Sequence, residues 1–182
     1  MSTRLEQVLA LHCSPALFGI KAANLISCSL DECPNLFEDI NELNKKHNPK
    51  ICFRILKSTG NRCLILIYKY DKLSKTIFEN DVYEYLVMHG YPNVKKLDLY
   101  LDFLQRKITA DGNFPHDIGV FLGYDLSDTI EFENGNKDCI YVGYWKVYSK
   151  KEEKLQIFER YNKCRDIVFS LLNKGYRLEA LI

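Results

Sequence analysis

The feature that most constrains the fold is a change in side-chain period near residue 51. Residues 51–57 and 62–70 are rich in β-branched and aromatic side chains, and residues 58–61, STGN, between them are typical of a tight turn. This pattern predicts a β-hairpin. Residues 63–68 read CLILIY and are apolar on both faces, so we expect the second strand to be the central strand of a sheet.

The remainder of the chain is dominated by amphipathic helical patterns. We expect helices over residues 3–11, 16–26, 31–47, 71–78, 80–89, 94–108 and 150–173, with a break at Asp111-Gly112-Asn113. Residues 139–148, CIYVGYWKVY, predict a third strand that could pair with the hairpin. Because strands do not alternate regularly with helices, the fold class is α+β, with a small, mostly antiparallel sheet (hairpin plus a third strand) flanked by several helices.

Length and charge narrow the class of protein. A chain of 182 residues without an internal linker predicts a single domain over residues 1–182. Lys and Arg number 25 against 24 Asp and Glu, and this balance argues against a nucleic-acid partner. No apolar run approaches the ~20 residues that span a membrane. Glu6 and Gln7 interrupt any signal-peptide apolar region, so we expect a soluble protein with no membrane partner.

The seven cysteines are odd in number and include no CxxC pair, and their spacing matches no zinc-finger pattern. Several lie within apolar stripes, where free cysteine behaves as a small hydrophobic residue. We therefore expect a reducing, cytoplasmic compartment with most thiols packed in the core, and no metal site is assigned. The cofactor, if there is one, stays unknown.

One segment, residues 113–128 (NFPHDIGVFLGYDLSD), combines two helix starts with one helix stop. The first start has its N-cap at position 113 or 114 and Pro115 in the first turn. Asp117 there complements the positive end of the helix dipole. His116 shares that end, which disfavours the imidazolium form, so we expect a neutral imidazole available as a base, ligand or hydrogen-bond partner.

Gly123 is the natural end of this short helix, and Asp125 is the expected N-cap of the next. Asp128 follows three residues later and resembles the second member of a capping box. The simpler interpretation of the whole segment is a tight joint between two helices, in which His116 holds a loop.

A second candidate lies at residues 11–15, LHCSP. Ser14 is a possible N-cap and Pro15 a possible first helical residue, so Cys13 would lie beside backbone N–H groups that lower a thiol pKa. His12 is adjacent and could take the proton. Burial of Cys13 between two helices is the simpler interpretation.

Three functional hypotheses follow. The favoured one is an accessory or binding protein with a groove near His116 and Trp145 that takes a small molecule or a partner protein. The second is a thiol-dependent hydrolase or acyl-transfer enzyme with Cys13 as nucleophile, His116 as base and Asp117 as orienting carboxylate. The third is a metal-binding or redox protein that uses Cys13 with His12 and His116. The candidate ligand-binding residues are His12, Lys21, Tyr124 and Trp145.

Three motifs in this order resemble a family of small uncharacterised proteins of anaerobic, clostridia-like bacteria, classed as a domain of unknown function. They are LHCSPALFGIKAANLI at 11–26, FPHDIGVFLGYDLSD at 114–128, and YVGYWKVY at 141–148 followed by QIFERYNKC at 156–164. The chain has Asp117 where the family pattern FPHEIG has glutamate. The resemblance implies a bacterial cytoplasmic protein and brings no activity, cofactor or catalytic residue with it.

Overall fold

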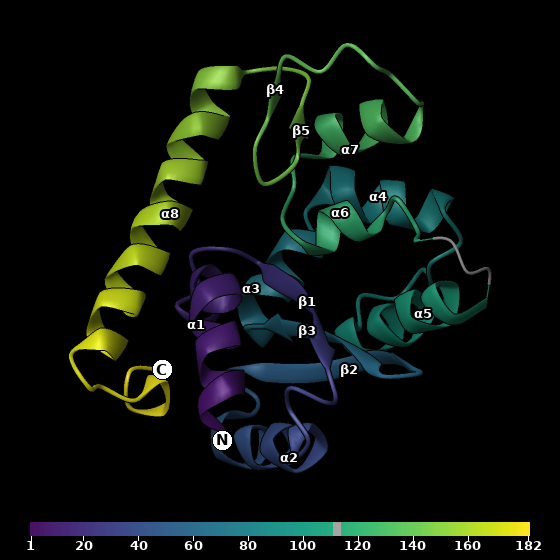
Figure 1. The fold of residues 1–182 in the computed structure, drawn as a ribbon. Helices are drawn as coiled ribbons and strands as arrows, with labels where there is room; N and C mark the ends of the chain where they lie inside the picture. Colours follow the sequence, from purple (N-terminus) through teal and green to yellow (C-terminus); the bar gives the residue numbers. More distant parts are fainter. Residues whose placement is uncertain (111–113) are drawn as a thin grey trace. The chain divides into compact units, whose positions relative to one another are not determined.

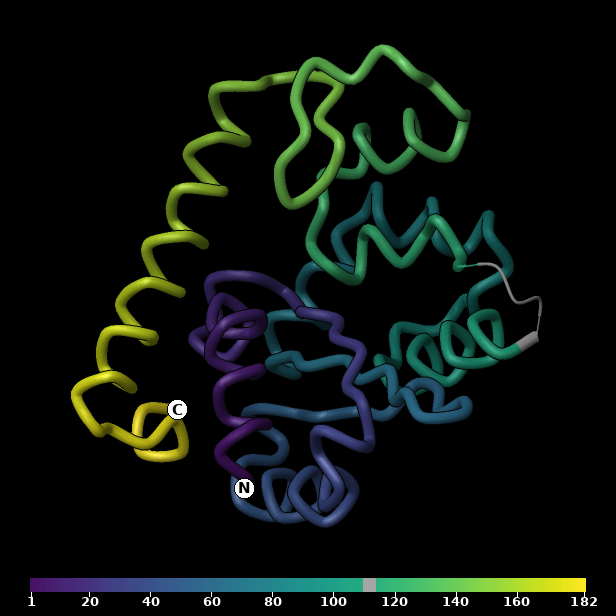
Figure 2. The backbone as a smooth tube through the Cα atoms, in the orientation of Figure 1, coloured from purple at the N-terminus to yellow at the C-terminus, as the bar shows by residue number. Residues whose placement is uncertain are grey.

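The computed structural model describes residues 1–110 and 114–182, which divide into two compact units. The first unit combines residues 1–72 with residues 161–182, and the second contains residues 73–160. Figure 1 shows the elements of both units, and Figure 2 follows the path of the backbone. The expected break at residues 111–113 lies outside the described residues.

The first unit holds a three-stranded antiparallel sheet in the order β1-β3-β2. The elements that lie wholly within it are α1 (Thr3–Leu17), β1 (Ala23–Ser29), α2 (Leu36–His47), β2 (Cys52–Thr59), β3 (Arg62–Tyr68) and the short 3-10 helix η1 (Leu178–Ala180). The expected hairpin is confirmed as β2 and β3. The expected central position of the apolar second strand is also confirmed, because β3 pairs with β1 on one side and β2 on the other.

The expected helix over residues 16–26 is wrong. The first helix does not stop near residue 11 but continues through Pro15, and Gly19 at φ +73° then ends it. Ser14 starts no new helix, because its hydroxyl donates to the Ala10 carbonyl one turn earlier. Residues 23–29 instead form β1, whose buried Ile26 and Cys28 lie two residues apart on one face.

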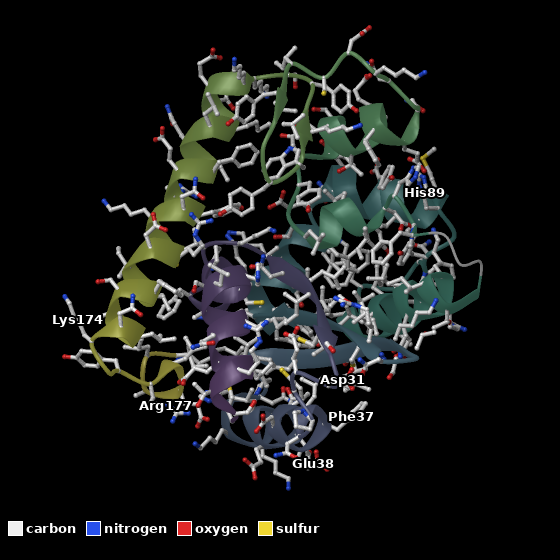
Figure 3. The ribbon with its side chains drawn as sticks, viewed as in Figure 1. Asp31, Phe37, Glu38, His89, Lys174 and Arg177 are labelled. Carbon is white, nitrogen blue, oxygen red and sulfur yellow. The ribbon has the colours of Figure 1, made fainter. Side chains whose placement is uncertain are left out.

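The core of the first unit lies between the sheet and helices α1 and α2. Each fully buried Leu or Ile there contributes about 1.5–3 kcal/mol relative to an exposed position. The C-terminal segment closes this core with Val168 and Leu178. The Glu6 carboxylate of α1 secures that segment, because Oε1 accepts hydrogen bonds from Arg177 Nε at 2.9 Å and from the Leu178 N–H at 2.7 Å. Figure 3 labels Arg177 beside this helix.

The second unit is mostly helical. It contains most of α3 (Tyr70–Ile77), then α4 (Asn80–Met88), α5 (Leu97–Ala110), α6 (Ile118–Phe121), α7 (Leu126–Glu133), β4 (Tyr141–Val142), β5 (Lys146–Val147) and the first part of α8 (Lys151–Asn173). The helices expected over residues 71–78, 80–89 and 150–173 are confirmed, and the helix expected over residues 94–108 is present but begins only at Leu97. Stacked and tilted aromatic rings fill its centre, with Tyr91 5.3 Å from Tyr100 and 4.5 Å from Phe103 between ring centroids.

Residues 139–148 do not join the three-stranded sheet, so the predicted pairing of a long third strand with the hairpin is wrong. The chain reverses at Gly143, and β4 pairs with β5 through Tyr141 opposite Val147 and Val142 opposite Lys146. A Cβ at Gly143 would lie 2.3 Å from the Phe158 ring, so only glycine fits this turn. The third strand of the main sheet is β1.

Candidate functional site

A pocket of about 220 Å³ lies within the second unit and is lined by residues of the segment before α6, of α7 and of β5. Its volume is below the range of about 300–1,000 Å³ that is common for drug-sized ligands, so it suits a smaller molecule. Most of its surface is apolar or aromatic. Residues on its walls and rim include Phe114, His116, Tyr124, Phe132, Trp145 and Lys146.

Trp145 forms one wall and is fixed in place by a buried carboxylate. Its indole Nε1 donates to Asp128 Oδ2 at 2.8 Å, and the Tyr148 backbone N–H donates to Asp128 Oδ1 at 2.9 Å. The Phe158 ring meets the indole edge-on at 4.6 Å between centroids. Asp128 is almost fully buried, so its two hydrogen bonds hold the indole and the start of the following segment rigidly.

Tyr124 stacks on Trp145, with ring centroids 4.9 Å apart and an interplanar angle of 24°. Burial raises the pKa of the Tyr124 phenol, which keeps it neutral at physiological pH. A Cβ at Gly119 would lie 3.0 Å from Thr129 Oγ1 and 3.2 Å from the Tyr124 ring. The absence of a side chain at position 119 therefore lets the tyrosine and threonine close on this wall.

The rim of the pocket is aromatic and carries basic nitrogen atoms. Phe132 is 42% exposed, and its ring is approached by the His116 ring at 5.2 Å between centroids. Lys146 Nζ lies 5.2 Å from the same Phe132 ring, in cation–π geometry. Two groups that can carry positive charge thus border one exposed aromatic ring.

Helix α7, which contributes residues to the pocket lining, begins at a capped N-terminus. Asp125 is its N-cap, as expected, and accepts from the Ser127 N–H at 3.0 Å. Burial alone would raise the pKa of Asp125, but hydrogen bonds from Lys154 and Ser127 more than offset this and hold it below its usual value. The capping-box role expected for Asp128 is wrong, because that carboxylate turns inward to Trp145.

A polar network is centred on Glu133, the residue that follows Phe132 in the sequence. Glu133 accepts from Tyr85 Oη at 2.9 Å and is 2.9 Å from His89 Nε2. Burial would raise the pKa of Glu133, yet the hydrogen bonds from Tyr85 and His89 lower it, with a smaller electrostatic contribution from His116. His89, labelled in Figure 3, follows the end of α4, and its two ring nitrogens contact the Glu133 carboxylate and the Tyr85 carbonyl.

The local structure around His116 differs from the expectation. The helix begins only at Ile118, is four residues long and has Asp117 as its N-cap, so His116 lies before the helix and not in its first turn. Asp117 is buried and forms an ion pair with Lys107. The expected end of this helix at Gly123, with φ +72°, is confirmed.

The other predicted residues lie in the first unit. Cys13 is fully buried within α1, not at a helix start, and burial raises the pKa of its thiol. Lys21 is 4% exposed, and burial lowers its pKa to about 8. Its Nζ lies 5.8 Å from the centre of the Tyr161 ring. His12 is exposed on α1.

The pocket therefore gathers three predicted residues, His116, Tyr124 and Trp145. Cys13 and its neighbours belong to the other unit. Lys146 and the role of Asp128 were not predicted from the sequence. Lys146 directly follows Trp145 in the sequence, and this could have marked it as a candidate. The role of Asp128 could not have been predicted in this way, because it depends on the fold. No cluster of three or more His, Cys, Asp or Glu side chains suited to a metal occurs within residues 1–110 and 114–182.

Comparisons with known proteins place the chain in a family. Searches of curated proteins and of solved structures each found no match. No helix in the described part of the chain has the length and apolar character needed to cross a membrane. The family described as "Protein of unknown function (DUF3793)" matches residues 9–182. Because this match covers almost all of the sequence, the chain belongs to the DUF3793 family.

Proposed function

We propose that this protein binds a small, flat, mostly apolar molecule in the pocket of its second unit. The observation that carries the proposal is the stacked pair of Tyr124 and Trp145 on the pocket wall, 4.9 Å apart. Aromatic side chains bind ring-shaped ligands through large contact areas with little loss of conformational freedom. The indole is already held by Asp128, so little ordering accompanies binding.

The apolar lining and the few placed polar groups are the features expected of a ligand site. The alternative, a thiol-dependent enzyme using Cys13, His116 and Asp117, has less support. The thiol of Cys13 is buried with a raised pKa, and Asp117 is paired with Lys107. A thiolate nucleophile needs the opposite environment, with a lowered pKa and access to substrate.

The setting of this activity is inferred from the cysteines and from the motifs. All seven cysteines are free, and six of them are buried. Free thiols in this number favour a reducing compartment. Together with the motif resemblance, this supports a bacterial cytoplasmic protein.

The test is calorimetric titration with a neutral two-ring probe, 2-naphthamide. We expect saturable binding to the wild type. Replacing Tyr124 by Leu removes a stacking partner worth about 0.5–1.5 kcal/mol, so the affinity should fall about 2- to 12-fold. The matched control is Tyr176→Leu, at an exposed tyrosine of the first unit. Equal loss in both variants, or no loss in Tyr124→Leu, would contradict the proposed site.

A further inference from the structure

We propose that the natural ligand of this pocket is an aromatic acid, a flat apolar body that carries an anionic group, and that Lys146 and His116 hold this group at the rim. The inference rests on the proposed function. It goes further by naming the charge of the ligand and the residues that select it.

The first observation is the unmatched positive charge of Lys146. The structure shows no ion pair or hydrogen bond for its ammonium group within residues 1–110 and 114–182, where Nζ lies over the face of the Phe132 ring. A lysine ammonium has three N–H donors, and a contact with the face of an aromatic ring does not occupy them with a hydrogen-bond acceptor or an anion. The ammonium can therefore serve an incoming anion.

The second observation is that the nearby carboxylates already have hydrogen-bond partners on the protein. Asp128 accepts from Trp145 and Tyr148, and Glu133 accepts from Tyr85 and is bound to His89. Asp128 also has a lysine ammonium, that of Lys154, at 3.9 Å. The acids near the pocket thus have partners on the protein, whereas the ammonium of Lys146 has none among the described residues.

The third observation concerns His116. Its ring packs edge-on against Phe132 at 5.2 Å, and its two nitrogens make no hydrogen bond within the described residues. Imidazole can donate a hydrogen bond to a carboxylate in its neutral or its protonated form. With Lys146 against the same ring, it supplies a second donor to one anionic group.

These positions divide the ligand into two parts. The apolar body stacks between the aromatic walls of the pocket, and the acid group stays at the open rim, where it retains part of its hydration. Burying a charge in the pocket itself would be far more costly. The arrangement therefore selects against a cationic analogue, which would face Lys146, and gains little from a neutral one.

The test compares three probes of the same shape, namely 2-naphthoate, 2-naphthamide and (2-naphthyl)methylammonium, by calorimetry at pH 7. We expect naphthoate to bind about three- to tenfold more tightly than the amide, and the ammonium probe to bind most weakly. The preference should decrease with added salt, because exposed charges are screened.

A pair of matched variants assigns the preference to the rim. Lys146→Met should remove most of the preference for naphthoate over the amide when both probes are measured on the same variant. The control, Lys137→Met, makes the same charge change at an exposed lysine outside the pocket and should keep the preference.

The possible failures are distinguishable. Equal binding of the three probes to the wild type overturns the inference and leaves the proposed function intact. A preference that persists in Lys146→Met overturns the role of that lysine. If none of the probes binds, the proposed function fails and the inference falls with it.

Discussion

Replacing Asp128 by Ala should loosen the pocket wall at a calculable cost. The carboxylate accepts two hydrogen bonds, from Trp145 Nε1 at 2.8 Å and from the Tyr148 N–H at 2.9 Å. A hydrogen bond to a charged group contributes about 1.5–3 kcal/mol, and a donor left buried without a partner is itself unfavourable. We expect Asp128→Ala to lower the free energy of unfolding of the second unit by about 3 kcal/mol or more.

The conservative variant Asp128→Asn should cost roughly half as much. Its amide oxygen can keep one of the two bonds, while its NH2 group faces the other donor. Lys154 keeps its ion pair with Asp125 in both variants, so little of the loss arises from an unpaired ammonium.

The assay is urea unfolding followed by the fluorescence of Trp145, which is the single tryptophan of the sequence. With a denaturant slope of about 1.5 kcal/mol per M, the midpoint for Asp128→Ala should fall by about 2 M. Asp138→Ala is the matched control at an exposed position. If the two alanine variants unfold within about 0.5 kcal/mol of each other, the role assigned to Asp128 is refuted, since ordinary surface changes stay within that range.

Three further predictions use the same protein. Gly143→Ala must displace the Phe158 ring, because the ring would lie 2.3 Å from the new Cβ. The variant should destabilise the second unit by about 1–3 kcal/mol in the urea assay. An unchanged midpoint would count against the turn geometry. Cys139 is half-exposed while the other cysteines are buried, so Ellman's reagent should modify one thiol rapidly in the native protein and none rapidly in Cys139→Ser; a rapid phase that survives would contradict this burial pattern. Asp125 has a folded-state pKa below its unfolded value of about 3.9, so its contribution to stability is complete above that pH and is lost as the pH falls through the folded pKa. Unfolding measured between pH 7 and pH 3 should therefore show a steeper loss for the wild type than for Asp125→Asn, which cannot ionise; parallel curves would refute the linkage.

Local signals in the sequence were sufficient for most of the fold. The hairpin of β2 and β3 follows from residue type and a tight turn, and the long helices follow from apolar residues at helical spacing. The strand β1 was missed because its partner β3 is some forty residues away, and the small residues near Ala23 fit a helix equally well. The pairing across that distance, not the local pattern, determines its conformation. The single domain predicted over the chain stays a prediction, which cooperative unfolding of both units would test.

The pocket, too, could be predicted from the sequence only in part. Sequence reasoning named His116, Tyr124 and Trp145 as candidates, and the fold brings them together. It assigned Asp128 to a helix cap because the spacing from Asp125 suits one. Only the reversal of the chain at Gly143 brings the indole N–H back to that carboxylate, and no local pattern encodes this.

The first unit is interrupted in sequence, and this has a consequence for the order of folding during synthesis. Its core contains Leu5 and Leu9 from one end of the chain and Val168 and Leu178 from the other. Residues 73–160 are all made before those last two leave the ribosome, so the second unit can fold while the first still lacks part of its core. Domains usually fold from the N-terminus onward as they are made. Here the unit that contains α1 is completed only after the second unit has been made, and α1 stays dependent on residues translated later than residue 160.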